Sequence, residues 1–419
     1  MKNMENNRRE FIKTASMGGL GAGLLGADSF GLSNVADQLP AGLLDEKSGM
    51  KITGIQTYFN ANNHYVEVLT DAGITGLGEA TLNTRQLAVD GVFKHLEPVL
   101  VGQDPMRIEH IWQSIFRGTF WRGGPVLLSA LSGIDMALWD IKGKALNTPV
   151  YNLLGGKCRD KMRVYINVGG RTPDDLCRNA ERVVAEGYTL VRICPHDNID
   201  GFYEPGTQVR RSIPFMRELR KAIGDDIEIV FEVHTRLSPT RAIELCNAIA
   251  EYKPVFVEDP IRADSPESFR VLRSHTNVPI GTSEKLGAKW DYKTIIEEDL
   301  VDYLRTDVCN CGGITEMKKI AAYGEPHYME MVPHGVPHVG YLAAMHVNFA
   351  TPNFYCQENW ISGQKPEHLK YDVIFENGFQ YLGDAPGLGI ELIKDKLNRP
   401  FVMREHPYWR REDGTVQDW

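Results

Sequence analysis

Short apolar segments alternate with amphipathic segments through the second half of the chain. Apolar residues spaced three and four apart predict helices at 174–186, 239–251 and 314–323. Compact apolar runs predict eight strands, at 162–168, 189–194, 228–233, 254–259, 279–284, 303–308, 328–333 and 353–358. Strands that alternate with helices pair in parallel through right-handed crossovers, and eight of them predict a closed (β/α)8 barrel. The alternative, an open doubly wound sheet, usually has a Gly-rich turn after its first strand, which this chain lacks.

The first half of the chain has a different pattern. Residues 51–60 and 65–70 alternate between apolar and polar positions like strands, and the turn signal Asp71-Ala72-Gly73 follows them. Residues 126–144 have the apolar spacing of a long helix. We therefore expect an α+β domain at 50–160, a barrel at 161–385 and a C-terminal segment at 386–419.

The N-terminal 36 residues have the pattern of a targeting segment. Arg8-Arg9-Glu10-Phe11-Ile12-Lys13 precedes a Gly-, Ala- and Leu-rich stretch at 15–27, which resembles a twin-arginine export signal. This stretch is too short and too Gly-rich to span a membrane stably. We expect a periplasmic or exported protein; if 1–36 is only an N-terminal tail, the protein is cytoplasmic.

Composition limits the classes of partner. Among 419 residues, 42% are apolar and 24% are charged, as in an ordinary soluble protein. A net charge of −9 leaves no basic surplus to meet phosphates, so we expect no nucleic-acid partner. The seven cysteines include no CxxC pair, and we interpret them as mostly buried small hydrophobes.

Three glutamates stand at the carboxyl ends of consecutive predicted strands. The same separation, 26 residues, divides Glu232 from Glu258 and Glu258 from Glu284, which is about one β/α unit. In a barrel the carboxyl ends of the strands meet at one mouth, where catalytic residues collect. Carboxylates that converge there repel one another unless a hard cation such as Mg²⁺ binds them. The alternative is that loop lysines and arginines neutralise them.

Two histidines and an aspartate flank these glutamates. His234 lies two residues after Glu232, so both side chains point to the same face of one strand. His334 follows the seventh predicted strand, and Asp307 ends the neighbouring sixth strand, where it can orient His334 and raise its basicity. We therefore expect all three to take part in catalysis.

Several longer motifs resemble a known family. They are Ala137-Leu138-Trp139-Asp140-Ile141-Lys142-Gly143-Lys144, Val257-Glu258-Asp259-Pro260 and Cys311-Gly312-Gly313-Ile314-Thr315. At these residues the chain resembles the mandelate racemase subgroup of the enolase superfamily, over about 50–400. Within it, Phe120-Trp121-Arg122-Gly123-Gly124-Pro125 and Thr351-Pro352-Asn353-Phe354 are similar to the mannonate branch of the sugar-acid dehydratases that act on galactonate and mannonate.

The resemblance implies a role for each candidate residue. Glu232, Glu258 and Glu284 match the ligands of one Mg²⁺ per subunit, although Glu232 stands where Asp is more usual. His334 with Asp307 matches the basic dyad, His234 the acid, and Glu358 the residue that binds the substrate carboxylate. Arg192 matches an arginine that pairs with a tyrosine base, for which Tyr203 is the candidate; the alternative for Tyr203 is loop packing.

The resemblance also implies that the α+β domain caps the barrel mouth and selects the substrate. The loops at 60–64 and 81–85 are the candidates, and Trp121 and Arg122 are expected to line the pocket, with a bridge between the two domains as the alternative for Arg122. The C-terminal segment is expected to pack back on this cap. Relatives are commonly oligomers, so a homo-oligomer is expected.

The expected reaction is dehydration of a sugar acid to a 2-keto-3-deoxy acid. Loss of a proton next to a carboxylate needs a metal to stabilise the developing charge. Three alternatives remain open: an epimerase or cycloisomerase, a Schiff-base aldolase that uses Lys285, and a catalytically silent exported sugar-acid binder.

Overall fold

The computed structural model describes residues 48–197, 201–361, 363, 365–403 and 408–418. These residues belong to one unit that begins at Glu46. The targeting segment predicted at 1–36 lies outside the described residues. Within the described ranges, no helix is both long enough and apolar enough to cross a membrane.

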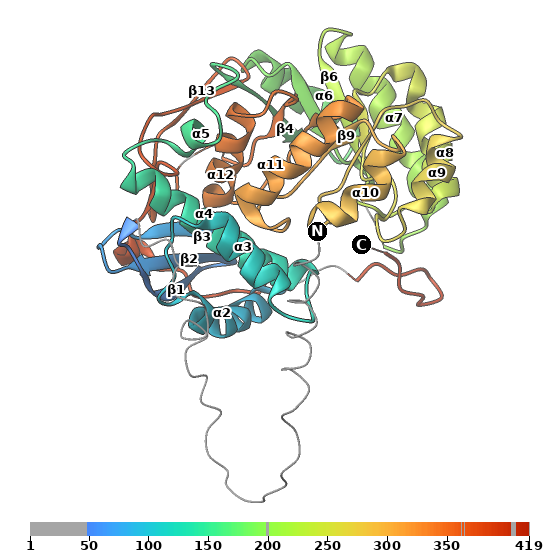
Figure 1. The fold of residues 1–419 in the computed structure, drawn as a ribbon. Coiled ribbons are helices and arrows are strands. Elements are labelled where there is room, and N and C mark those ends of the chain that lie inside the picture. The colour runs from blue at the N-terminus through green and yellow to red at the C-terminus, as the bar shows by residue number, and fades with distance from the viewer. Residues whose placement is uncertain (1–47, 198–200, 362, 364, 404–407, 419) are drawn as a thin grey trace, which may run out of the picture. The chain divides into compact units, whose positions relative to one another are not determined.

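The N-terminal domain is an antiparallel sheet packed against helices. The sheet has the order β1 (Ile52–Asn60), β2 (Asn63–Thr70) and β3 (Gly76–Glu79). The helices are α2 (Gln86–Leu100), α3 (Ile108–Arg117), α4 (Pro125–Ala145) and α5 (Val150–Leu153). In Figure 1, α4 runs between β3 and the barrel helix α11 (Gly313–Gly324). A helix with neighbours on both sides is apolar around most of its circumference, and 14 residues of α4 are buried.

Glycine allows α4 to lie directly on the sheet. A Cβ atom on Gly78 would stand 1.9 Å from the carbonyl oxygen of Gly133, and one on Gly76 equally close to the carbonyl oxygen of Ala137. Both glycines of β3 therefore face the backbone of α4 with no room for a side chain.

Eight parallel strands form the barrel, as the sequence predicted. Their bounds in chain order are β4 (Met162–Val168), β5 (Leu190–Ile193), β6 (Glu228–Glu232), β7 (Phe256–Glu258), β8 (Ile280–Thr282), β9 (Tyr303–Leu304), β10 (Glu330–Met331) and β11 (Gln357–Glu358). Consecutive strands pair in parallel from β4 to β10. β11 pairs with β4, and a bridge between Met331 and Phe354 connects the last two strands. These pairs close the ring.

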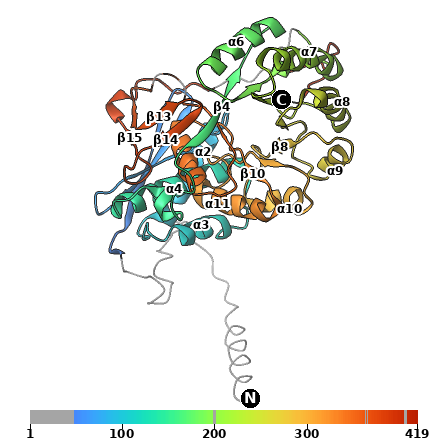
Figure 2. The same ribbon diagram turned by 90° about the horizontal axis from the view of Figure 1, so that it is seen from above.

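A helix follows each of the first seven strands in the described part of the chain. These helices are α6 (Pro173–Ala185), α7 (Pro205–Ile223), α8 (Pro239–Ile249), α9 (Glu267–Arg273), α10 (Lys289–Glu297), α11 and α12 (His338–Phe349). Figure 2 shows α6 to α11 following one another around the outside of the strands. The short 3-10 turns are η3 (Pro195–Asp197), η4 (Ala250–Tyr252), η5 (Glu325–His327) and η6 (Lys394–Lys396).

The last β/α unit differs from the first seven. Among the described residues, β11 is followed by short strands instead of an eighth helix: β12 (Leu369–Tyr371), β13 (Val373–Glu376), β14 (Phe379–Leu382) and β15 (Ile390–Leu392). β14 pairs antiparallel with β4, and β12 with β15. The architecture is thus a (β/α)7β barrel with an α+β cap. Residues alternate in burial along β14, which is the period of a strand and not of a helix.

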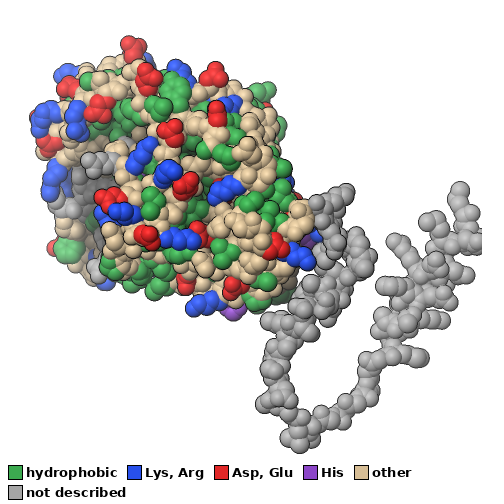
Figure 3. Space-filling model, turned by 90° about the vertical axis from the view of Figure 1, so that its left-hand side faces the viewer, with side chains coloured by type: hydrophobic (Ala, Val, Ile, Leu, Met, Phe, Trp, Pro, Cys, Tyr) green, Lys and Arg blue, Asp and Glu red, His purple; other side chains and the backbone are tan. Residues whose placement is uncertain are grey.

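The C-terminal segment contacts both domains. Its first part lies on the cap, where the amide of Val402 donates to the carbonyl of Ala61 at 3.2 Å and Lys394 pairs with Glu67 at 2.6 Å. Its end lies on the barrel, because the carbonyl of Arg410 accepts the amide of Tyr203 at 2.8 Å. The domain boundaries stay predictions. On the face that Figure 3 shows, acidic and basic side chains are interspersed.

Candidate active site

Charged side chains from five strands meet at the carboxyl ends of the barrel strands. Arg192 lies on β5, Glu232 ends β6, Glu258 ends β7 and Glu358 ends β11, while Arg305 directly follows β9. All five are buried, and Arg305 has an exposed fraction of 0%. Because the strands are parallel, their ends share one mouth, as the sequence predicted.

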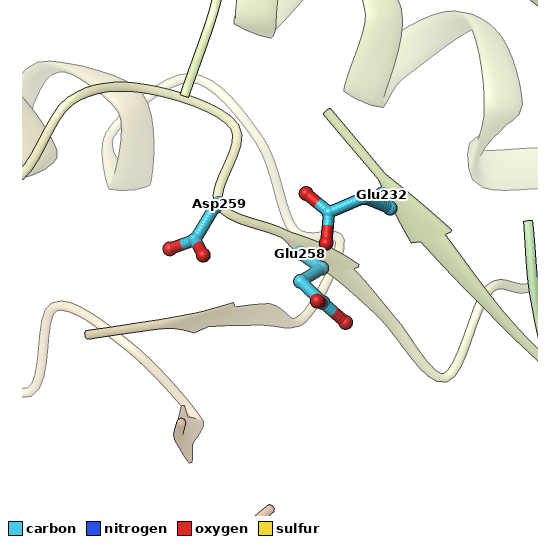
Figure 4. A group of neighbouring side chains, drawn as sticks. All are labelled: Glu232, Glu258 and Asp259. Carbon is cyan, nitrogen blue, oxygen red and sulfur yellow. The ribbon is translucent and has the colours of Figure 1, made fainter. Parts of the chain in front are cut away.

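Three carboxylates stand close enough together to hold a metal ion. Oxygen atoms of Glu232, Glu258 and Asp259 lie within 4.8 Å of one another, and all three residues are buried. Figure 4 shows Glu232 reaching from the end of β6 toward β7, where Glu258 and Asp259 follow one another along the chain. Asp259 was not among the sequence candidates, although it stands in the Glu-Asp-Pro motif.

Glu284 occupies a neighbouring position. Its Oε2 lies 3.5 Å from Nε2 of His334 and 3.8 Å from Nη2 of Arg305. Two of the three predicted ligands are thus in the compact carboxylate group, and the third stands beside the predicted base. The complete ligand set stays a prediction.

Two guanidinium groups form ion pairs with these carboxylates and with Glu358. Nη1 of Arg192 contacts Glu258 and lies 2.9 Å from Oε2 of Glu232, and its Nη2 lies 2.9 Å from Oε1 of Glu358. Nη2 of Arg305 lies 2.6 Å from Oε1 of Glu258 and 3.1 Å from Oε2 of Glu358. Arg305 was not among the residues that the sequence predicted for the site, whose one basic strand residue was Arg192. Its signal was a charged residue directly after an apolar strand.

The buried charges shift the pKa values of these acids in opposite directions. Burial, and then the nearby Glu258, raise the pKa of Glu232 well above its usual value. Burial also acts to raise the pKa of Glu358, but Arg192 and Arg305 outweigh it and lower that pKa. For Glu284, burial is likewise outweighed, by His334 and Arg305, which bring the pKa to about 2.

The donor set fits a hard cation. Oε2 of Glu258 and Oδ2 of Asp259 are buried and have no hydrogen-bond partner among the described residues. Buried carboxylate oxygens without a partner are costly, and oxygen is the ligand that Mg²⁺ and Ca²⁺ prefer. Glu232, Glu258 and Asp259, with Glu284 beside them, are the residues that would hold such an ion.

His334 and Asp307 form the pair that the sequence predicted. Nδ1 of His334 lies 2.8 Å from Oδ2 of Asp307. Asp307 is held in turn by the amide of Cys309 and the side-chain amide of Asn310, each at 2.7 Å. Burial acts to lower the pKa of His334, but Glu284 and Asp307 outweigh it and raise the pKa to about 9.

His234 lies near the same carboxylates and comes from the loop that follows β6, whereas His334 follows β10. Its Nε2 lies 4.0 Å from Oε2 of Glu232, and its Nδ1 lies 3.3 Å from Sγ of Cys194. The backbone of His234 is left-handed, with φ of 54°, which is uncommon outside glycine and is found at functional sites. The contact with Cys194 was not foreseen.

A cavity of about 250 Å³ opens beside this group. Its lining includes Asn167, Gly170, Arg192, Cys194 and His234. Asn167 donates to Oε1 of Glu358 at 3.0 Å, so the cavity wall is connected to the charged cluster. An anionic ligand in the cavity would meet the Arg192 guanidinium and the His234 ring together.

Three further candidates stand outside this cluster. The hydroxyl of Tyr203 donates to the carbonyl of Arg236 at 3.4 Å, and its ring lies against Trp409. Trp121 is 80% exposed, and the Arg122 guanidinium lies 5.4 Å from the ring centre of Phe116. The structure thus shows packing contacts for Tyr203 and Arg122 and an exposed side chain for Trp121, and the roles of all three in catalysis or substrate binding stay predictions.

Comparison with known proteins identifies the family. Residues 48–155 match the model described as the N-terminal domain of mandelate racemase / muconate lactonizing enzyme, and residues 175–396 match the model described as enolase C-terminal domain-like. The chain belongs to the mandelate racemase / muconate lactonizing enzyme family. The superfamily suggested by the sequence motifs is thereby confirmed.

Members of this family with similar sequences include named dehydratases. A D-mannonate dehydratase of Caulobacter vibrioides is 36% identical over 84% of this chain and 95% of its own length. A D-galactonate dehydratase of Ralstonia pickettii is 35% identical over 88% of this chain and 100% of its own length. Among solved structures, an enolase from Pantoea ananatis with bound D-gluconate and Mg has a TM-score of 0.82 and 32% identity, over 88% of this chain and 99% of that one.

Proposed function

We propose that this chain is a Mg²⁺-dependent sugar-acid dehydratase. It would remove the proton at C2 of an aldonate and eliminate the hydroxyl at C3, which gives a 2-keto-3-deoxy acid. One observation carries the proposal: two imidazoles, His334 beside Glu284 and His234 beside Glu232, approach one buried acidic cluster. Relatives named for mannonate and galactonate, and one solved with gluconate and Mg, support this class of substrate.

Mg²⁺, when bound to these carboxylates, would neutralise part of their charge and stabilise the negative charge that develops on the substrate carboxylate. Glu284 is the strongest of the charges that raise the pKa of His334 to about 9. Neutralising the charge of Glu284 would bring the pKa of His334 toward its ordinary value. In its neutral form the ring would accept the C2 proton at Nε2, while Asp307 holds Nδ1.

His234 performs the second proton transfer in this proposal. Its Nε2 is the ring atom nearer the acidic cluster, and it donates a proton to the departing C3 hydroxyl, which leaves as water. Arg192 lies in the same cavity wall and attracts the anionic substrate. General acid and base groups of this kind each contribute roughly 10²- to 10⁴-fold in rate.

The test is a panel of aldonates and uronate-derived acids, each incubated with the purified protein. With MgCl2 we expect a 2-keto acid lighter than its substrate by one water, and with EDTA we expect no product. A product of unchanged mass would instead indicate an epimerase or cycloisomerase, which uses the same first proton transfer. Absence of turnover on every acid, with metal bound, would contradict the proposal.

We further propose that residues 1–36 direct export. The support is the Arg8-Arg9 pair ahead of the weakly apolar stretch at 15–27. In the full chain, Arg8→Lys with Arg9→Lys should keep the protein in the cytoplasmic fraction, whereas the unchanged chain should reach the periplasm. Equal distribution of the two would contradict export by this route.

A further inference from the structure

The two imidazoles of the site have partners of different chemistry. Nδ1 of His334 faces the carboxylate of Asp307, which only accepts hydrogen bonds when it is ionised. Nδ1 of His234 faces the thiol of Cys194, which is a weak donor and a weak acceptor. The carboxylate places a negative charge beside its imidazole, whereas the thiol offers its imidazole a weak hydrogen bond.

Cys194 and His234 come from neighbouring strands. Cys194 directly follows β5, and His234 lies two residues after the end of β6, which pairs with β5 in parallel. The His234 backbone is fixed on its other side, because its amide donates to Oε1 of Glu232 and the amide of Thr235 donates to the carbonyl of Asp259 at 2.6 Å. The backbone therefore fixes the position of the His234 Cα atom, and the contact with Cys194 is made by the ring itself, at Nδ1.

We propose that Cys194 is a positioning residue for His234: its Sγ holds Nδ1 at 3.3 Å and so turns Nε2 toward Glu232 and the acidic cluster. This inference rests on the proposed function, in which His234 is the acid. In that role the ring donates its proton from Nε2, the ring atom that lies 4.0 Å from Oε2 of Glu232, while Nδ1 contacts the thiol. Cys194 and His234 also line the same cavity, so the pair stands where a substrate would bind.

The matched variants are Cys194→Ala, which removes the contact, and Cys194→Ser, which replaces the thiol by a hydroxyl that can donate and accept. Cys177→Ala is the control, because Cys177 is also a partly buried free cysteine but lies on α6 and is not in the lining of the cavity. The readout separates the two proton transfers. In ²H₂O, exchange at C2 of recovered substrate reports the base, and 2-keto acid formation reports the acid.

We expect Cys194→Ala to lower the kcat for 2-keto acid formation at least about tenfold, since misplaced catalytic groups cost up to about 10²-fold. Exchange at C2 should persist, so the ratio of exchange to elimination rises. KM should change by less than about threefold. Cys194→Ser should restore most of the wild-type ratio, and Cys177→Ala should leave it unchanged. An unchanged ratio in Cys194→Ala overturns the inference.

Crystal structures of the same variants decide the remaining cases. If Cys194→Ala loses exchange and elimination together, or if the wild type turns over no aldonate and the proposed function fails, the orientation of the His234 ring is still measurable. A ring turned away from Glu232 in Cys194→Ala and retained in Cys194→Ser supports positioning by the thiol. A ring that keeps its wild-type orientation in Cys194→Ala overturns it.

Discussion

Oδ2 of Asp135 in the cap helix α4 accepts a hydrogen bond from the backbone amide of Thr315, at 2.9 Å, in the first turn of the barrel helix α11. Glu79 makes the equivalent contact elsewhere, since its Oε2 accepts the amides of Val339 and Gly340 in the first turn of α12 at 3.0 and 3.2 Å. Acids are stabilising at helix N-termini, where backbone amides lack partners.

These two contacts link the cap to the strand ends that carry candidate catalytic residues. α11 follows the strand end that carries Arg305 and Asp307, and α12 follows the loop that carries His334. The cap thus holds the N-termini of both helices, which begin six residues after Asp307 and four residues after His334. We infer that the cap stabilises the position of the His334–Asp307 pair.

Asp135→Asn should remove a pH dependence of stability. Burial raises the pKa of Asp135 from 3.8 to about 7 in the folded state. The folded state therefore binds the carboxyl proton of Asp135 more tightly than the unfolded state does. The stabilisation of the folded state by this proton is fully present below pH 3.8 and is lost as the pH rises to about 7. A shift of this size corresponds to at most about 4 kcal/mol.

The check is urea unfolding between pH 4 and 8. The free energy of unfolding of Asp135→Asn minus that of the wild type should grow as the pH rises through this range. Asp225→Asn is the control, because Asp225 is largely exposed, and its difference should stay flat. A flat profile for Asp135→Asn would refute the raised pKa.

Gly313→Ala should destabilise the same contact between the cap helix α4 and the barrel helix α11. A Cβ on Gly313 would stand 2.4 Å from Oδ2 of Asp135, and its φ is +85°. Gly102 has the same φ of +85° but no atom within 4 Å of its Cβ position, so Gly102→Ala carries the backbone cost alone, about 1–2 kcal/mol. In thermal unfolding, Gly313→Ala should therefore lower the Tm clearly more than Gly102→Ala. Equal decreases in Tm for the two variants would mean that the Asp135 side chain moves away from residue 313 at no cost in free energy.

Arg305→Met should destabilise the protein, because it removes a positive charge from among the buried carboxylates. Removing one partner of a buried ion pair costs about 3–5 kcal/mol, and Arg305 contacts Glu258, Glu284 and Glu358. Because a bound cation replaces part of the lost charge, MgCl2 should raise the Tm of Arg305→Met more than that of the wild type.

Arg270→Met is the matched control, since Arg270 pairs with Glu298 at 2.5 Å on the surface, where solvent screens the charges and such pairs contribute little to stability. Its response to MgCl2 should equal that of the wild type. If MgCl2 shifts the Tm of Arg305→Met and of the wild type equally, the carboxylates near Arg305 do not hold the ion.

The sequence predicted the barrel strands closely, because the spacing from one strand end to the next matches a β/α unit. The spacing also placed Glu232, Glu258 and Glu358 correctly at one mouth. It did not predict Arg305 or Asp259 there, since the direction of a side chain near a strand end depends on local backbone geometry. The short strands that take the place of an eighth helix among the described residues after β11 were not predicted for a similar reason, because the segments at 369–382 are specified by pairing with β4 and β15 and not by their own periodicity.

The motifs behind the family resemblance have a structural role that their spacing alone did not reveal. Trp139 of α4 donates to the hydroxyl of Thr315 at 2.8 Å, and the amide of Gly312 donates to Ser132 at 2.9 Å. The helical motif at 137–144 and the glycine motif at 311–315 therefore contact each other where the cap packs on the barrel. A contact between segments 180 residues apart depends on tertiary packing, which one sequence does not display.

The division of labour between the two histidines is tested most directly by following one substrate in ²H₂O with MgCl2, using the aldonate that the panel identifies. His334→Asn should abolish both deuterium incorporation at C2 and 2-keto acid formation, whereas His234→Asn should still incorporate deuterium at C2 but form at least about 10²-fold less product. Deuterium incorporation that persists in His334→Asn, and disappears in His234→Asn, would contradict the assignment of His334 as the base.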